Sequence, residues 1–161
     1  MAVLKLHLND FEEVDFDIIA IHSVLEDYRL AYFINQKLPI LLSKSKDEVE
    51  IINKDGTAFF NIFEYQDELN NVQWCLIANK NEVIINKKVN NKIFLNSTQE
   101  IESKTYLLPE LKKVDYFLKI KNNKGVCDIK QIVKKLNTIE RIETVYVVNS
   151  EKIKSKNNLI F

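Results

Sequence analysis

Short apolar runs and alternating apolar positions divide the chain into many strands and two helical segments. The continuous run at Phe16–Ile21 is typical of a buried strand. Apolar residues at helical spacing follow at Val24–Lys37 and recur at Ile129–Leu136, with Ile132 and Leu136 on the predicted inner side. The other predicted strands are short: Val3–Leu8, Ile40–Leu42, Val49–Ile52, Ala58–Tyr65, Val72–Ala78, Val83–Ile85, Thr105–Leu108, Val114–Lys121 and Val145–Val148.

Polar residues next to these segments predict where helices begin and where the chain turns. Ser23 with Glu26, and Asp128 with Gln131, stand at the spacing of a capping box and predict two helix starts. The chain has only two glycines and two prolines, so turns must rely on asparagine, which tolerates positive φ. Turns are therefore predicted at Asn70-Asn71, Asn90-Asn91 and Asn122-Asn123, and a β-hairpin at Asp55-Gly56.

The order of the predicted elements favours an α+β fold. The sequence "VDFDIIAI" at Val14–Ile21 is similar to "VDYFLKIK" at Val114–Lys121, and each precedes a helix and then a strand. We predict a single domain over residues 1–161, with a mostly antiparallel sheet and two helices packed on one face. Two βαβ units flanking a β-meander, with ferredoxin-like elements, are one arrangement of these segments.

Charge and composition narrow the function classes. The 161 residues carry 23 basic and 23 acidic side chains, and this zero net charge argues against a dedicated nucleic-acid binder. No apolar run reaches the roughly 18 residues of a membrane span, and the start of the chain has no signal-peptide pattern, so we predict a cytoplasmic protein. Two glycines cannot form a phosphate-binding glycine loop, and no cofactor is predicted. Cys75 and Cys127 are predicted to be buried packing thiols.

The zero net charge conceals two halves of opposite sign. Residues 1–100 carry 10 basic and 16 acidic side chains, and residues 101–161 carry 13 and 7. If Ile132 faces inward, the outer side of its helix presents basic residues, which we interpret as a docking surface for an acidic protein partner. These candidate partner-binding residues are Lys130, Lys134, Lys135 and Arg141. A homodimer formed through an edge strand is a further hypothesis.

The nine residues "LPELKKVDY" contain the most conspicuous polar motif. Glu110 and Asp115 could act as paired carboxylates in acid–base catalysis, but no nucleophile or oxyanion donor stands nearby in sequence. We therefore favour a structural corner between two strands, with Asp115 accepting backbone N–H groups and Glu110 meeting a basic neighbour. His22 and Glu26 would give only two metal ligands, so we predict no metal site and no catalytic residue.

This motif resembles the one that names the IPExxxVDY family, a set of uncharacterised bacterial proteins. Pro109, Glu110, Val114, Asp115 and Tyr116 match it, and Leu108 stands where the family name has isoleucine. The resemblance extends over the whole chain and implies no established activity. The functional hypothesis is thus a non-enzymatic adaptor or regulatory module that binds a protein. The alternative is an enzyme of unrecognised type that uses Glu110, Asp115 or His22.

The segment "EKIKSKNNLIF" ends in three apolar residues, Leu159, Ile160 and Phe161. Three large apolar side chains have little reason to follow a solvated lysine-rich stretch unless they are buried. We expect them to pack against this domain, with the lysines in solvent. Insertion into a groove of a partner protein is the alternative.

Overall fold

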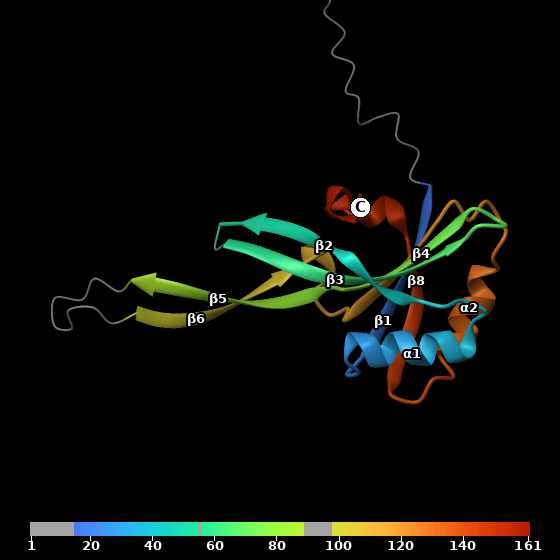
Figure 1. Cartoon of the computed structure of the whole chain (residues 1–161), viewed down its shortest axis with the longest axis horizontal. Coiled ribbons are helices and arrows are strands. Elements are labelled where there is room, and N and C mark those ends of the chain that lie inside the picture. The colour runs from blue at the N-terminus through green and yellow to red at the C-terminus, as the bar shows by residue number, and fades with distance from the viewer. Residues whose placement is uncertain (1–14, 55, 89–97) are drawn as a thin grey trace, which may run out of the picture.

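The computed structural model describes residues 15–54, 56–88 and 98–161. Within these ranges the chain forms eight strands, two α-helices and three short 3-10 helices (Figure 1). In chain order they are β1 (Phe16–Ser23), α1 (Asp27–Lys37), β2 (Ser43–Asn53), β3 (Gly56–Asp67), β4 (Val72–Ala78), β5 (Lys80–Lys88), β6 (Thr98–Tyr106), η2 (Pro109–Leu111), β7 (Tyr116–Lys121), α2 (Ile129–Leu136), β8 (Ile142–Val148), η3 (Ser150–Lys152) and η4 (Lys156–Leu159).

Six strands form one antiparallel sheet in the order β2-β3-β4-β7-β1-β8. The strands β2, β3 and β4 form the central part of the predicted meander, whereas Val83–Ile85, also assigned to it, belongs to the separate β5-β6 sheet. The four strands β4-β7-β1-β8 have the order and directions of a ferredoxin-like sheet, because β1 lies between β7 and β8, which α2 connects. The predicted α+β fold is confirmed, with the hairpins β2-β3 and β5-β6 added to this arrangement.

Both helices cover the same face of the sheet, as predicted (Figure 1). Leu30 and Ile34 of α1 and Ile132 and Leu136 of α2 pack in one core with the odd-numbered apolar residues of β1. Trp74 belongs to this core, together with Phe63 and the partly buried Tyr65. These aromatic side chains are therefore packing residues, as their strand alternation indicates.

The opposite face of the sheet has a second core that the sequence pattern did not predict. Its strand residues, such as Ile18, Ala20 and Phe117, are covered by the corner at 107–114 and by the C-terminal segment, which we define as residues 150–161. Ile153 and Leu159 are the buried residues of that segment. In Figure 1 the C-terminal segment and the two helices lie on opposite sides of the sheet.

The second sheet is the hairpin of β5 and β6, which extends away from the main sheet (Figure 1). It begins immediately after β4 and returns immediately before the corner. Its base is fixed to β3, because Asn81 donates a side-chain hydrogen bond to the carbonyl of Phe59.

The start of α1 differs from the prediction. The helix begins at Asp27, and its N-cap residue Glu26 makes no side-chain capping bond. Ser23 belongs to β1 instead: its Oγ donates to the carbonyl of Arg141 (2.8 Å) and accepts from the N–H of Leu25 (3.2 Å). The capping-box prediction for Ser23 and Glu26 is wrong, because pairing with β8 extends β1 through Ser23.

Most of the other local predictions that can be compared are confirmed. Asp128 caps α2 by accepting the N–H of Gln131. Asn71 and Asn122 have φ of 54° and 60°, as turn residues that replace glycine should. Residues 40–42 are irregular rather than a strand, and β2 begins at Ser43. The predicted strand Val3–Leu8, the Asn90-Asn91 turn and Asp55 lie outside the described residues; Gly56 pairs with Asn53 across the predicted hairpin.

An asparagine at or just after the last turn of each helix binds the backbone of the segment that follows. Asn35 accepts the N–H of Leu42 and donates to its carbonyl (2.8 and 3.0 Å). Asn137 makes the same two bonds to Val145 in β8 (3.0 and 3.1 Å). Because the outward backbone groups of Val145 are occupied, a homodimer through the β8 edge would have to displace Asn137.

Candidate functional site

The "LPELKKVDY" motif forms a corner between β6 and β7. Pro109 begins the 3-10 helix η2, where its missing N–H costs nothing, and Leu108 before it is extended with φ of −118°. β6 ends at Tyr106, two residues earlier than the predicted strand, and the following Leu107 and Leu108 are fully buried. Val114 is also buried in the second core, whereas Tyr116, two residues later, packs against the core beneath the helices.

Asn79, which the sequence analysis did not single out, holds this corner together. It is fully buried, and its Oδ1 accepts the N–H of Leu108 at 2.8 Å. Its Nδ2 donates to the carbonyls of Leu111 (2.8 Å) and Val114 (3.0 Å). Asn79 also uses its own N–H and carbonyl, to Asp115 and Leu107 respectively, so one residue satisfies five groups of the corner.

Asp115 and Tyr116 attach the corner to the start of the chain. Asp115 accepts the N–H of Ser23 (2.9 Å) and forms an ion pair with Lys80 (2.9 Å). Its predicted role as an acceptor of backbone N–H groups is confirmed. The hydroxyl of Tyr116 donates to the carbonyl of Leu25 (2.6 Å), and burial, with the nearby acidic groups, raises its pKa to about 12.

Glu110 attaches the corner to the C-terminal segment. Its carboxylate accepts the N–H groups of Lys154 (2.7 Å) and Ser155 (2.8 Å) and the hydroxyl of Ser155 (3.0 Å). The prediction that Glu110 meets a basic side chain is therefore wrong, because its partners are backbone N–H groups and the Ser155 hydroxyl. Burial raises the pKa of Glu110, but these hydrogen bonds outweigh that effect and hold the pKa below its ordinary value of 4.5.

Glu110→Gln is expected to lower the free energy of unfolding by about 1 kcal/mol at pH 7, because charge-assisted bonds to the C-terminal segment are weakened. A carboxylate with a lowered pKa stabilises the fold above its ordinary pKa, and this contribution is lost as the pH falls through the folded-state pKa. Urea unfolding at pH 7 and pH 3.5 should therefore show a smaller difference between wild type and variant at the lower pH. An equal difference at both values would contradict this role of Glu110.

The last three residues of the chain have different environments. Leu159 is fully buried in the second core, as predicted. Ile160 is 62% exposed and Phe161 37% exposed, so the expectation that all three residues are buried is wrong for Ile160 and Phe161. The 3-10 helix η4 turns Leu159 inward and leaves Ile160 in solvent.

Leu159→Ala should therefore cost about 2–4 kcal/mol of stability, since it leaves a cavity in the second core. The matched variant Ile160→Ala removes a similar side chain one residue further and should cost less than about 0.5 kcal/mol. Chemical denaturation of the two variants measures the difference. Equal losses would show that the C-terminal segment does not dock as described.

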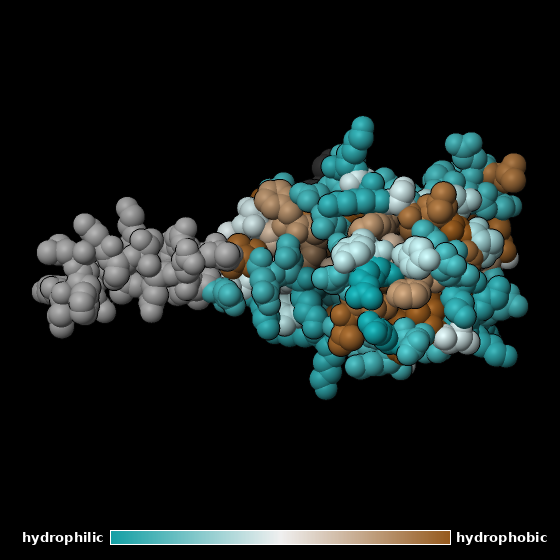
Figure 2. Space-filling view, turned by 60° about the horizontal axis from the view of Figure 1, so that its bottom comes forward, coloured by the Kyte–Doolittle hydropathy of each residue, from teal (hydrophilic) through white to brown (hydrophobic). Residues whose placement is uncertain are grey.

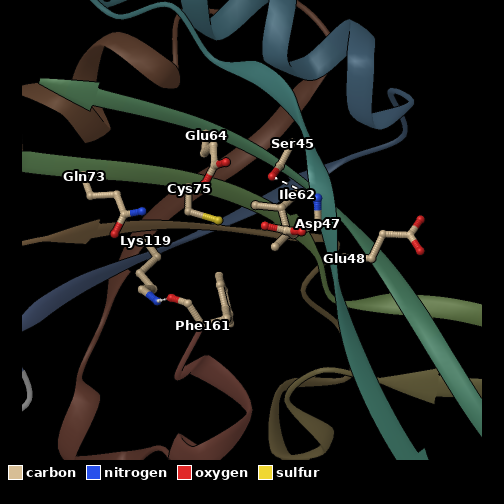
Figure 3. Close-up of a pocket in the computed structure, with 9 residues that line it drawn as sticks. All are labelled: Ser45, Asp47, Glu48, Ile62, Glu64, Gln73, Cys75, Lys119 and Phe161. Carbon is tan, nitrogen blue, oxygen red and sulfur yellow. Dashed lines mark hydrogen bonds between the residues drawn. The ribbon is translucent and has the colours of Figure 1, made fainter.

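Lys119 lies beneath this segment and is the most unusual ionisable group of the second core. It is 3% exposed and pairs with Cys75 across β7 and β4. Its Nζ donates to the main-chain oxygens of Leu159 (2.7 Å) and Phe161 (3.2 Å) and lies 3.8 Å from the centroid of the Phe161 ring. Figure 3 shows Lys119 and Phe161 on one side of a pocket of about 280 Å³, which is also lined by Ser45, Asp47, Glu48, Ile62, Glu64, Gln73 and Cys75.

Burial is the main cause of the pKa shifts of Lys119 and of its strand neighbour Cys75. It lowers the pKa of Lys119 to about 8 and raises the pKa of Cys75 to about 12. The thiol of Cys75 is thus a protonated packing group, as predicted. Cys127 is only partly buried, and burial also raises the pKa of its thiol.

The lowered pKa of Lys119 makes a prediction about stability. Between pH 8 and 10.5 Lys119 is protonated in the unfolded chain and largely neutral in the folded one. The free energy of unfolding therefore rises with pH across this window, because the cost of burying a charged lysine disappears. Relative to Lys119→Met, the wild-type free energy of unfolding should rise by on the order of 2 kcal/mol across this window. Denaturation curves at pH 7.5 and 10 measure the change, and parallel pH profiles of the two proteins would contradict it.

The outer side of α2 carries the predicted basic residues. Ile132 and Leu136 are buried, which leaves Lys130, Lys134 and Lys135 exposed. Arg141 is exposed in the turn before β8, with φ of 69°, and its carbonyl is held by Ser23. Figure 2 shows the helix side of the molecule, where hydrophilic side chains predominate. Among the described residues, the single ion pair is that of Lys80 and Asp115, so none of these four cations is paired there.

The residues of the enzyme hypothesis are not brought into one cavity. The Nε2 atom of His22 lies 3.3 Å from the hydroxyl of Tyr146, and the two rings stack at 5.7 Å. Glu110 and Asp115 bind different segments of the chain through backbone N–H groups. Over residues 15–54, 56–88 and 98–161, no cluster of three potential metal ligands occurs. The same part of the chain contains no helix with the length and apolar character to span a membrane.

Comparisons with protein-family models, with curated proteins and with solved structures gave no match.

Proposed function

We propose that this protein is a cytoplasmic, non-enzymatic protein-binding module of the IPExxxVDY family, and that the basic outer face of α2 binds an acidic partner. The observation that carries the proposal is the set of four exposed cations at 130, 134, 135 and 141, none of which forms an ion pair with another residue that the structure describes. Glu140 is the only acidic residue from Ile129 to Arg141. Such a surface attracts an oppositely charged partner and accelerates their encounter.

The rigidity of this surface supports a binding role. Asp128 caps the start of α2, Asn137 ties its end to β8, and Ile132 anchors its inner side. The lysines therefore project from an element whose backbone is fixed, which reduces the entropy lost when a partner binds.

The roles of the motif residues support the family proposal. Pro109, Glu110, Val114, Asp115 and Tyr116 each stabilise a different part of the corner, which gives a physical reason for a motif without catalytic function. The free thiols of Cys75 and Cys127 suit a reducing compartment and support the cytoplasmic assignment.

Affinity purification of the tagged protein at low salt tests the proposal. A variant with Lys130→Glu, Lys134→Glu and Lys135→Glu should fold normally and lose the acidic proteins that wild type retains. The matched control reverses three other exposed lysines, at 44, 46 and 54, on the opposite edge strand and its turn, and should retain them. Equal capture by all three proteins would refute the α2 surface.

A further inference from the structure

The tight turn before α2 holds a lysine where the backbone favours asparagine or glycine. The N–H of Val126 binds the carbonyl of Asn123 at 2.7 Å and closes this turn. Its central residues, Lys124 and Gly125, have φ of 40° and 81°. Two successive positive φ angles are typical of a type I′ turn, whose first central position usually holds asparagine, aspartate or glycine. Lys124 is an exception to that preference.

The turn after α2 contains a second exception. The N–H of Ile142 binds the carbonyl of Ile139 (3.2 Å), and Arg141, the third residue of this turn, has φ of 69°. A positive φ at this position favours asparagine, or glycine, which has no Cβ to crowd the following carbonyl oxygen. Ser23 holds Arg141 in this conformation, because its Oγ donates to the carbonyl of Arg141.

The fold itself gives no reason for a cation at either position. The other positive-φ positions of the described residues, 56, 71, 122 and 125, are all glycine or asparagine. The side chains of Lys124 and Arg141 are exposed, and neither forms an ion pair or a side-chain hydrogen bond with another residue that the structure describes. Backbone strain without such a partner within the molecule is typical of functional positions.

We infer that Lys124 and Arg141 anchor an acidic helix of the partner, which lies along α2. This inference rests on the proposed protein-binding function and specifies the shape of the partner. Figure 1 shows the loop before α2 and the turn after it at opposite ends of that helix. Between these ends, Lys130 and Lys134 stand four residues apart on α2. A partner helix with carboxylates four residues apart repeats its charges at the same spacing, about one 5.4 Å turn.

The turns make the two end cations better anchors than ordinary surface lysines. Each side chain starts from a backbone that a turn hydrogen bond closes, so less backbone freedom is lost when the partner binds. The guanidinium of Arg141 can also bind one carboxylate through two parallel N–H groups, which a lysine cannot do.

Thermal unfolding separates a binding role of the anchors from a role in the fold. The double variant Lys124→Asn, Arg141→Asn places in both turns the residue that the chain uses at 71 and 122. Its melting temperature should be about 1–4 °C above that of wild type, because the backbone strain is reduced. A lower melting temperature would show that the two cations serve the fold, and would overturn the inference.

Fluorescence anisotropy at 20 mM NaCl measures binding to a labelled, alanine-based helical peptide with glutamates at every fourth position. The double variant should bind this peptide at least about tenfold more weakly than wild type. The control Lys113→Asn removes an exposed lysine from the corner on the opposite face of the sheet, and should bind as wild type does. A second peptide of the same composition, with its glutamates distributed around the helix, should bind wild type at least about threefold more weakly.

The outcomes distinguish the anchors from the proposed function. If reversal of the lysines at 130, 134 and 135 abolishes binding but the double variant binds as wild type does, the anchors are overturned and the α2 surface stands. Binding that this reversal leaves unchanged would refute the α2 surface itself. Equal affinity of wild type for the two peptides, or no saturable binding to either, would overturn the acidic helix as the partner.

Discussion

Replacing Ile132 with aspartate is expected to abolish cooperative folding. Ile132 is 7% exposed and packs with Leu136 between α2 and the sheet. The substitution removes an apolar side chain from this core and places a carboxylate there with no donor prepared for it. Together these effects should cost more than about 5 kcal/mol, which is comparable to the whole stability of a small domain.

The neighbouring residue provides the control. Gln131 is exposed on the same turn of α2, so Gln131→Asp introduces the same side chain into solvent near the helix start, where a negative charge is favourable. Circular dichroism during thermal unfolding should show a cooperative transition for Gln131→Asp and none for Ile132→Asp. A cooperative, native-like Ile132→Asp protein would refute the assignment of the inner face of α2.

Asn79→Ala should produce the largest effect of any polar substitution, a loss of about 3–5 kcal/mol. The change leaves the N–H of Leu108 and the carbonyls of Leu111 and Val114 without their partner inside a buried corner. Each unsatisfied buried group costs roughly 1–3 kcal/mol, and the lost contacts are not fully additive. Urea denaturation gives the value.

A second substitution at this position separates the hydrogen bonds from side-chain size. Asn79→Asp keeps the acceptor for Leu108 but directs a negative charge at two carbonyl oxygens, so it should destabilise strongly at pH 7 and less at low pH, where a protonated carboxyl donates again. Asn70→Ala, at an exposed turn, should cost less than about 1 kcal/mol. Similar losses for Asn70→Ala and Asn79→Ala would show that the corner does not depend on Asn79.

The apolar spacing of neighbouring residues was sufficient to predict the bounds of some strands and helices. The bounds of β4 and of α2 agree with Val72–Ala78 and Ile129–Leu136, because their apolar spacing and the Asp128 cap are properties of neighbouring residues. The start of α1 was missed for the opposite reason. Ser23 has the local features of a helix cap, but its N–H binds Asp115 and its hydroxyl binds the carbonyl of Arg141, both about a hundred residues later.

In the candidate sites, too, contacts between residues far apart in the sequence could not be predicted. The motif itself predicted a corner and the acceptor role of Asp115, since both follow from proline geometry and carboxylate chemistry. Asn79 could not be identified, because it reaches the corner from the bend between β4 and β5, and the whole β5-β6 hairpin separates the two in sequence. Lys119 lies in the predicted strand Val114–Lys121, but its burial could not be foreseen, because the C-terminal segment that covers it lies 40 residues later.

The salt dependence of partner binding tests the central claim most directly, namely that the basic face of α2 is a docking surface. The dissociation constant of the purified partner is measured at 50–500 mM NaCl for wild type and for the variant reversed at 130, 134 and 135. For wild type it should increase steeply with salt, because ions screen the opposite charges. The variant should bind at least about tenfold more weakly at 50 mM and depend less on salt, consistent with the loss of close charge pairs at the interface. Equal dissociation constants and equal salt dependence for the two proteins would contradict the claim.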